Sequence, residues 1–275
     1  MHFDFHFTAI QILWTLTFAA QLVLLVVLLG RDRARRFPWF TLGIVMMALR
    51  LLASRLLLGR MPTITLDAIF VIMADVAAIV GVLIVVEMAR RAFAPVRRNA
   101  WLAFALTALI IGGGILCALG RPWPAWKTLT ADSLIADLRL MQMGAQRLDM
   151  LVDLLTVELG LLVILFGRRT GAGWRSHTQR IVIGLSTASS AQLAVETIWQ
   201  LIARHAVPHS QAEYDRIVGL RDKLFNANGA LYIAVLIWWI VVLWMDEPGA
   251  AANAEQPSGT TPQPEYLSSE DANPA

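Results

Sequence analysis

TAIQILWTLTFAAQLVLLVVLLGRDRARR, residues 8–36, is the stretch that decides the fold of this chain. Its first 22 residues carry no charged side chain. A helix of that length, rising about 1.5 Å per residue, crosses the roughly 30 Å hydrocarbon layer of a membrane. Four arginines follow at once, and arginines at the end of a span stay on the cytoplasmic side. The stretch therefore predicts a transmembrane helix that runs from the outside to the cytoplasm.

Six further apolar runs of similar length follow along the 275 residues. The composition agrees, since 57% of the residues are apolar, 16% are charged and the mean hydropathy is +0.60. We therefore predict an all-α fold, a bundle of seven transmembrane helices over residues 1–247. The predicted spans are residues 8–29, 39–58, 66–88, 100–119, 147–166, 181–203 and 224–245.

Basic residues alternate between the loops of this predicted bundle. The first, third and fifth loops hold four arginines each, whereas the second has only Arg60 and the longer fourth and sixth loops balance their basic residues with acids. This pattern predicts an N-terminus outside and a C-terminus in the cytoplasm. The 21 arginines against 2 lysines, with abundant alanine, are typical of GC-rich bacterial genomes, so the predicted location is the bacterial cytoplasmic membrane. Residues 248–275, rich in Pro, Ser, Gly, Asn and acids, predict a disordered cytoplasmic tail.

The two long outer loops show helical patterns of their own. Residues 132–143 place apolar side chains on one face, which predicts an amphipathic helix lying at the membrane interface. Ser210 and Glu213 have the spacing of a capping box and predict a short helix that runs toward Lys223.

Two arginines and two aspartates lie inside the second and third predicted spans, where an ionised side chain costs about 2.5–3.5 kcal/mol. Arg50 and Asp75 fall at similar depth in the hairpin that these spans form about residues 61–62. Arg55 and Asp67 match in the same way nearer the surface. The pattern predicts two structural ion pairs between these helices. Two roles stay open for them: fixing the register of the hairpin, or binding a ligand or ion.

Polar side chains of other spans reach a similar depth. In the fifth span they recur at spacings of 4, 3, 4, 3 and 4 and so share one face, at Gln142, Gln146, Asp149, Asp153, Thr156 and Gly160. The sixth span brings Glu196 to the depth of Asp153, and the seventh adds Tyr232. We predict a ligand site in the outer half of the bundle, formed by Arg50, Asp75, Asp153, Glu196 and Tyr232. The small polar residues of the sixth span have a second reading as close-packing residues.

Several functions are disfavoured by what the spans lack. Lys223 lies at the rim of the last span, which argues against a retinal Schiff base, and the predicted spans contain no histidine to hold haem, so no cofactor is expected. The outer histidines are scattered and Pro208 interrupts their spacing, so no metal site is expected from His2, His6, His205 and His209. Catalytic sequence motifs are absent, so the chain is not predicted to be an enzyme. Most arginines sit in short loops, which argues against a nucleic-acid partner.

The strings GRDRARRFPWF, residues 30–40, and VEMARRAF, residues 86–93, resemble those of uncharacterised bacterial heptahelical membrane proteins. More loosely, the helical region is similar to the seven-helix input modules of bacterial sensors. The resemblance implies recognition of an extracytoplasmic cue and its relay to an effector. No effector is attached here, so a separate protein would have to carry the signal.

The sequence thus predicts a receptor-like membrane protein, embedded in the lipid bilayer, that binds a small polar or anionic ligand from outside. Two alternatives stay open. One is a small-molecule or proton-coupled transporter in which a carboxylate takes up and releases protons. The other is a non-catalytic subunit of a membrane complex.

Overall fold

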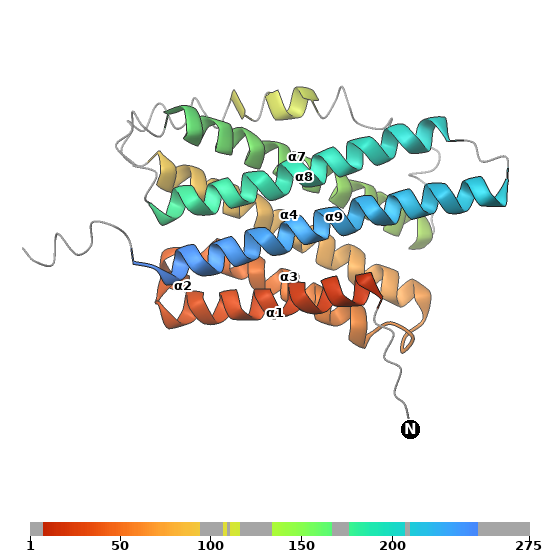
Figure 1. Cartoon of the computed structure of the whole chain (residues 1–275), viewed down its shortest axis with the longest axis horizontal. Coiled ribbons are helices and arrows are strands. Elements are labelled where there is room, and N and C mark those ends of the chain that lie inside the picture. Colours follow the sequence, from red (N-terminus) through yellow and green to blue (C-terminus); the bar gives the residue numbers. More distant parts are fainter. Residues whose placement is uncertain are drawn as a thin grey trace, which may run out of the picture.

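The computed structural model of the chain describes residues 8–93, 107–108, 111–115, 134–166, 176–206 and 210–246. Within these ranges the chain is all-helical and contains no strand (Figure 1). The main helices are α1 (Ala9–Gly30), α2 (Arg33–Arg36), α3 (Pro38–Leu56), α4 (Thr63–Ala92), α7 (Leu134–Phe166), α8 (His177–His205) and α9 (Gln211–Trp244). The predicted tail, 248–275, and most of the predicted fourth span, 100–119, lie outside the described residues.

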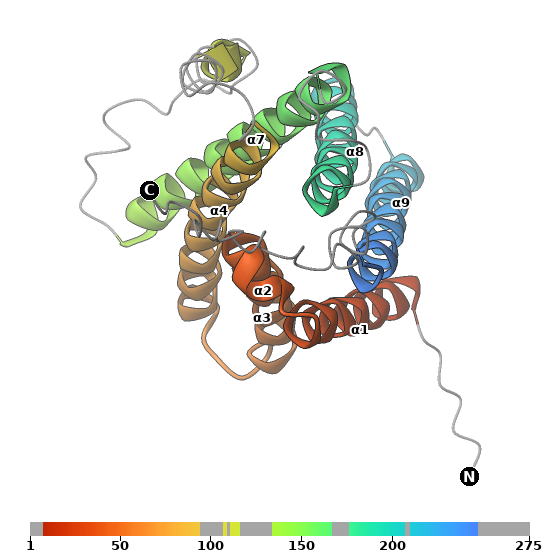
Figure 2. The ribbon, with the colours of Figure 1, turned by 90° about the vertical axis from the view of Figure 1, so that its left-hand side faces the viewer.

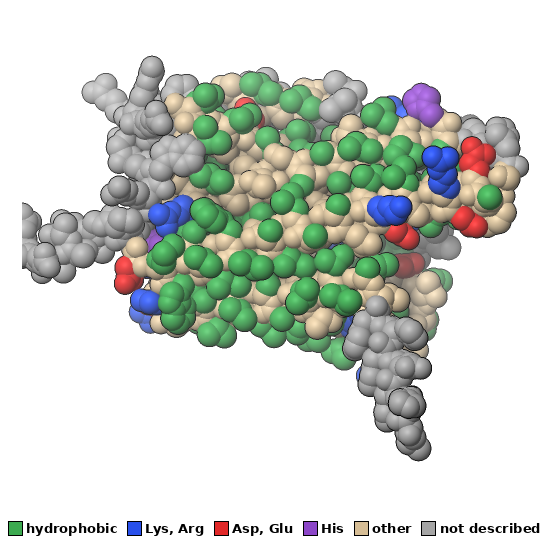
Figure 3. Space-filling view, viewed as in Figure 1, with side chains coloured by type: hydrophobic (Ala, Val, Ile, Leu, Met, Phe, Trp, Pro, Cys, Tyr) green, Lys and Arg blue, Asp and Glu red, His purple; other side chains and the backbone are tan. Residues whose placement is uncertain are grey.

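Five helices, α1, α3, α4, α8 and α9, are long and apolar enough to cross a membrane. The chain is therefore a multi-pass membrane protein. Their large apolar side chains are widely exposed, as at Val26 and Leu29, because lipid rather than protein surrounds them. On the face in Figure 3, hydrophobic side chains fill the middle and most charged side chains lie near the two ends.

The structure corrects two predictions about the outer segments. The amphipathic stretch 132–143 is not a separate helix, since residues 134–166 form one continuous helix of 33 residues. Ser210 does cap a helix, accepting a hydrogen bond from the Glu213 backbone N–H at 3.3 Å, but that helix continues for 34 residues to Trp244. Neither helix contains a proline, so nothing breaks the backbone hydrogen bonding where a loop was expected. At about 1.5 Å per residue both helices reach about 50 Å and extend beyond the hydrocarbon layer.

The helices form a closed ring in the order α1, α3, α4, α7, α8 and α9 (Figure 2). Each helix contacts the next one, and α9 returns to contact α1. α4 also contacts α8 across the ring. The first and last helices of the chain are thus neighbours.

The turn between α3 and α4 sets how these two helices match in depth. α3 ends at Leu56 and α4 begins at Thr63, with Gly59 between them at φ +76°, a conformation that glycine adopts readily. Arg50 lies six residues before the end of α3. Asp67 lies four residues after the start of α4, and Asp75 lies twelve residues after it. Arg50 is therefore closer in depth to Asp67 than to Asp75.

Large buried side chains gather at one end of the ring, which we call the closed end. They come from the second halves of α1, α4, α7 and α9 and the first halves of α3 and α8, and they include Leu24, Leu28, Phe37, Phe40, Met88, Leu159, Ile181, Leu236, Trp239 and Leu243. The arginines before α3 and those in the last turn of α4, Arg90 and Arg91, lie at this end. At the opposite end, the open end, several side chains between the helices are polar and exposed, as at Arg50, Asp67 and Asp149. The bundle is therefore packed at one end and accessible at the other.

Candidate functional site

One face of α7 carries four polar residues at the open end. Gln142, Gln146, Asp149 and Asp153 follow one another at helical spacing, so they point in similar directions. The first three lie beside α3 and α4 and line a cavity, whereas Asp153, one turn deeper, reaches α8. The predicted stripe thus divides its contacts between two sides of the ring.

A cavity of about 520 Å³ lies between α3, α4 and α7, and we call it the outer cavity. Its polar wall contains two guanidinium groups, two carboxylates and two amides, from Arg50, Arg139, Asp67, Asp149, Gln142 and Gln146. The remaining wall is apolar, from Ile64, Phe70, Val71, Ala74, Leu138 and Ala145. A few polar groups on an apolar wall are typical of small-molecule sites. Because both charge signs are present, the outer cavity suits a small ligand that carries both.

Hydrogen bonds connect α7, α8 and α9 next to the outer cavity. The Ser189 hydroxyl donates to the Asp153 carboxylate at 2.7 Å. Farther along α8, the Gln192 amide donates to the Glu196 carboxylate at 2.7 Å and accepts a hydrogen bond from the Asn228 amide of α9. These contacts hold the two acids in place and satisfy polar groups that would otherwise face lipid.

Four carboxylates, which we call the acidic layer, belong to Asp75, Asp149, Asp153 and Glu196. The Asp149 carboxylate lies within electrostatic range of the Arg50 guanidinium and of the Glu196 and Asp75 carboxylates. Asp153 is within range of Glu196 and Asp149. Carboxylates thus outnumber the nearby base, and like charges repel one another. A cationic group entering this layer reduces that repulsion.

Four of the five predicted ligand-site residues, Arg50, Asp75, Asp153 and Glu196, are brought within range of Asp149, which links them. Only Arg50 among them lines the outer cavity. Tyr232 is placed elsewhere: its hydroxyl accepts a hydrogen bond from the Gln21 amide at 3.4 Å and donates one to the Met47 sulfur at 3.0 Å. Its ring packs against the apolar core. Tyr232 therefore does not lie beside the carboxylates of the site, although its predicted depth in the membrane is similar to theirs.

Neither predicted ion pair is formed. Within the described ranges, the ion pairs closer than 4.0 Å are Arg31–Asp246, Arg33–Asp246, Arg35–Asp32 and Arg91–Glu87. The register of the α3–α4 turn explains why Arg50 does not pair with Asp75. Arg50 lines the outer cavity together with Asp67 and lies a turn or more out of register with Asp75. Arg55 instead places its guanidinium 5.0 Å from the centre of the Trp14 ring on α1.

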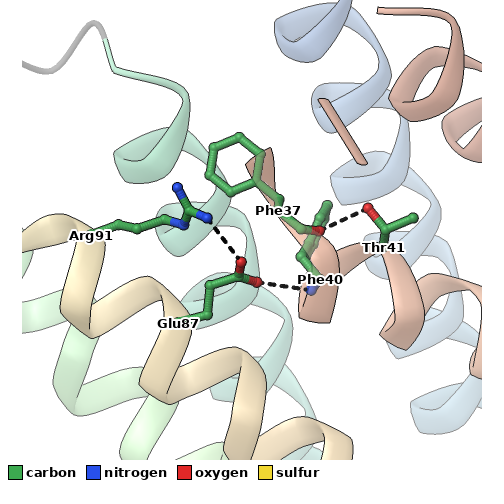
Figure 4. Close-up of polar contacts among 5 residues, drawn as sticks. All are labelled: Phe37, Phe40, Thr41, Glu87 and Arg91. Carbon is green, nitrogen blue, oxygen red and sulfur yellow. Dashed lines mark hydrogen bonds and ion pairs between the residues drawn. The ribbon is translucent and has the colours of Figure 1, made fainter. Parts of the chain in front are cut away.

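A charged site that sequence reasoning missed lies at the closed end (Figure 4). The Glu87 carboxylate, in a residue only 7% exposed, accepts hydrogen bonds from the Phe40 backbone N–H at 3.1 Å and from the Arg91 guanidinium at 3.3 Å. α3 begins after Phe37, which offers no side-chain acceptor, so Glu87 caps that helix from α4. The i, i+4 spacing of Glu87 and Arg91 was the available signal. This cluster anchors α3 to α4.

Asp149 is the other residue absent from the predicted ligand set, although the stripe on α7 already contained it. Its neighbours come from three other helices, which no spacing rule reveals. Within the described ranges, no three His, Cys, Asp or Glu side chains are grouped to hold a metal ion. His2, His6 and His209 lie outside these ranges, and the His205 ring is 2.9 Å from the Leu201 carbonyl oxygen of its own helix.

Comparison of the chain with protein families, with curated proteins and with solved structures found no match.

Proposed function

We propose that the chain crosses the bacterial cytoplasmic membrane seven times, with the open end outside and the closed end in the cytoplasm. Five spanning helices support this, together with the length of α7 and the apolar run 100–119. The described arginines before α3, those in the last turn of α4 and Arg180 in the first turn of α8 share the closed end, as the positive-inside rule requires.

Single-cysteine labelling tests this orientation. Cys117 is the only cysteine and is first replaced by alanine. A membrane-impermeant maleimide should then label Arg60→Cys in intact cells, whereas Arg90→Cys should react only after permeabilisation. Labelling of Arg90→Cys from outside would reverse the proposed orientation.

We further propose a receptor-like function in which a small polar ligand enters from outside and binds in the outer cavity. The observation that carries this proposal is the wall of that cavity, where Arg50 and Arg139 face Asp67 and Asp149 beside two amides. Arg50 suits a carboxylate of the ligand and Asp149 suits an ammonium group. A change in the charge balance around Asp149 then reaches α8 through Asp153 and Glu196. The relay to the cytoplasm requires a separate signalling partner.

Ligand-dependent thermal stability of the purified protein tests the binding site. A panel of amino acids, amines and carboxylic acids should contain a compound that raises the unfolding temperature, since a ligand at 100 times its Kd stabilises the folded state by about 2.7 kcal/mol. Arg50→Gln and Asp149→Asn should abolish the shift. Arg60→Gln, which removes the same charge from the exposed α3–α4 turn, should keep it. The proposal fails if no compound shifts the wild type or if Arg50→Gln and Arg60→Gln respond alike.

The acidic layer favours a second candidate function, a proton-coupled transporter. Asp153 and Glu196 each have a hydrogen-bond partner on α8, which fixes the position of both carboxylates. Uptake of the ligand into proteoliposomes, driven by a pH gradient and lost in Asp153→Asn, would support transport. Binding without uptake would favour the receptor. No single contact favours the third alternative, a non-catalytic subunit.

A further inference from the structure

A second cavity, of about 390 Å³, lies between α8 and α9 at the closed end. Its wall is formed by Ile183, Trp238, Val241, Val242 and Met245, with Arg180 as its one charged residue. We call it the α8–α9 groove. It shares no residue with the outer cavity and so needs a separate explanation.

The α8–α9 groove opens on the outer surface of the ring. Trp238, Val241 and Met245 are 47%, 50% and 46% exposed, whereas Val242 is 1% exposed and forms the floor. These four residues follow at spacings of 3, 1 and 3 and occupy one face of α9. Because α8 and α9 are both membrane-spanning helices, this face meets hydrocarbon rather than water.

Arg180 lies at the rim of the groove, at the depth of the membrane interface. It belongs to the first turn of α8, and Met245, beside it in the wall, immediately follows the end of α9. Figure 1 shows the start of α8 and the end of α9 at the same end of the bundle, and basic side chains lie there in Figure 3. Among the described residues, no carboxylate pairs with Arg180 within 4.0 Å, so its charge is available to a phosphate.

We propose that the α8–α9 groove binds an anionic phospholipid, with the lipid phosphate on Arg180 and an acyl chain along Trp238, Val241 and Met245. A free phosphate ion would find only one polar side chain in the groove, that of Arg180. The apolar wall suits an acyl chain instead. A basic residue at the rim of an apolar groove suits the phosphate of an anionic lipid headgroup. With the orientation proposed above, the lipid comes from the cytoplasmic leaflet.

Native mass spectrometry of the full chain tests this site with phosphatidylglycerol and phosphatidylcholine as probes. Wild-type protein should bind one phosphatidylglycerol more tightly than phosphatidylcholine. Arg180→Gln should weaken phosphatidylglycerol binding about fivefold, as expected for one basic residue at an anionic surface. Arg180→Lys should restore most of it. Millimolar inorganic phosphate should not displace the lipid.

Two further variants distinguish lipid binding in the groove from attraction of lipid to the general positive charge of the surface. Arg90→Gln removes an exposed arginine at the same end of the bundle but outside the groove, and it should leave the affinity unchanged. Val241→Trp fills the groove while keeping Arg180, and it should weaken binding of both lipids. Equal losses in Arg90→Gln and Arg180→Gln, displacement by phosphate, or unchanged binding in Val241→Trp would each overturn the proposal. Val241→Trp and Arg180→Lys keep the test valid if Arg180→Gln does not fold.

Discussion

Replacement of Glu87 is the sharpest test of how the closed end is held together. Glu87→Ala removes the acceptor of the Phe40 N–H and the carboxylate that pairs with the Arg91 guanidinium. A lost cap costs about 0.5–2 kcal/mol, and breaking a buried ion pair costs about 3–5 kcal/mol. The Arg91 side chain is 34% exposed and recovers some solvation, so we expect a loss near 3 kcal/mol.

The size of the loss should depend on the replacing side chain. Glu87→Gln keeps an oxygen that accepts from Phe40 and removes only the charge, so we expect about half the loss. For a chain of this size, about 3 kcal/mol corresponds to roughly 6–12 °C in the unfolding temperature. The assay is thermal unfolding of purified protein in detergent, followed by tryptophan fluorescence.

Glu158→Gln is the matched control, because Glu158 lies partly exposed on α7 and no hydrogen bond to its side chain occurs within the described ranges. It should unfold within about 1 °C of the wild type. If Glu87→Ala unfolds at the wild-type temperature, or Glu158→Gln loses as much, the carboxylate does not anchor α3 to α4 and the reasoning is refuted.

Three other contacts yield predictions of the same kind. Gly160→Ala places a methyl group against Ser186 of α8 and should lower stability by about 1–3 kcal/mol in the same unfolding assay, with Ser186→Gly restoring part of it. Arg55→Gln and Trp14→Leu should show a coupling energy of about 0.5–1 kcal/mol in a double-mutant cycle, and zero coupling would rule out their cation–π contact. Tyr232→Phe should cost about 1–3 kcal/mol by leaving a buried amide on α1 without its hydrogen bond, while the ligand-induced stabilisation stays unchanged. Loss of the ligand-induced stabilisation in Tyr232→Phe would indicate that Tyr232 belongs to the ligand site.

The spanning helices could be predicted well because each contains a long window in which apolar residues predominate. The bounds of α1, α3 and α4 differ from the predicted spans by at most four residues, since the signal depends on composition alone. The length of α7 was underestimated for the opposite reason. Its first half carries polar residues at helical spacing, which fits both a separate interfacial helix and an extension of the span.

The candidate site was predicted less well, because depth along the membrane is one coordinate of three. The α3–α4 turn was predicted two or three residues too late in the chain. As a result Arg50 was matched in depth with Asp75, whereas in the structure Arg50 lies closer in depth to Asp67. Tyr232 reaches a suitable depth but contacts α1 and α3. Asp153 of α7 and Glu196 of α8 lie within electrostatic range of each other, because helices adjacent in sequence are also adjacent in the ring.

The contact between α1 and α9 has a consequence for biosynthesis. Gln21 is 1% exposed, and the hydrogen bond that its side-chain amide makes is to Tyr232, more than two hundred residues later. While the ribosome is still making the chain, this amide lacks its hydrogen-bond partner and stays in lipid or water until α9 is inserted. A nascent chain that stops before α9 therefore exposes a polar group in the bilayer, which gives membrane proteases a feature by which to distinguish incomplete molecules from finished ones.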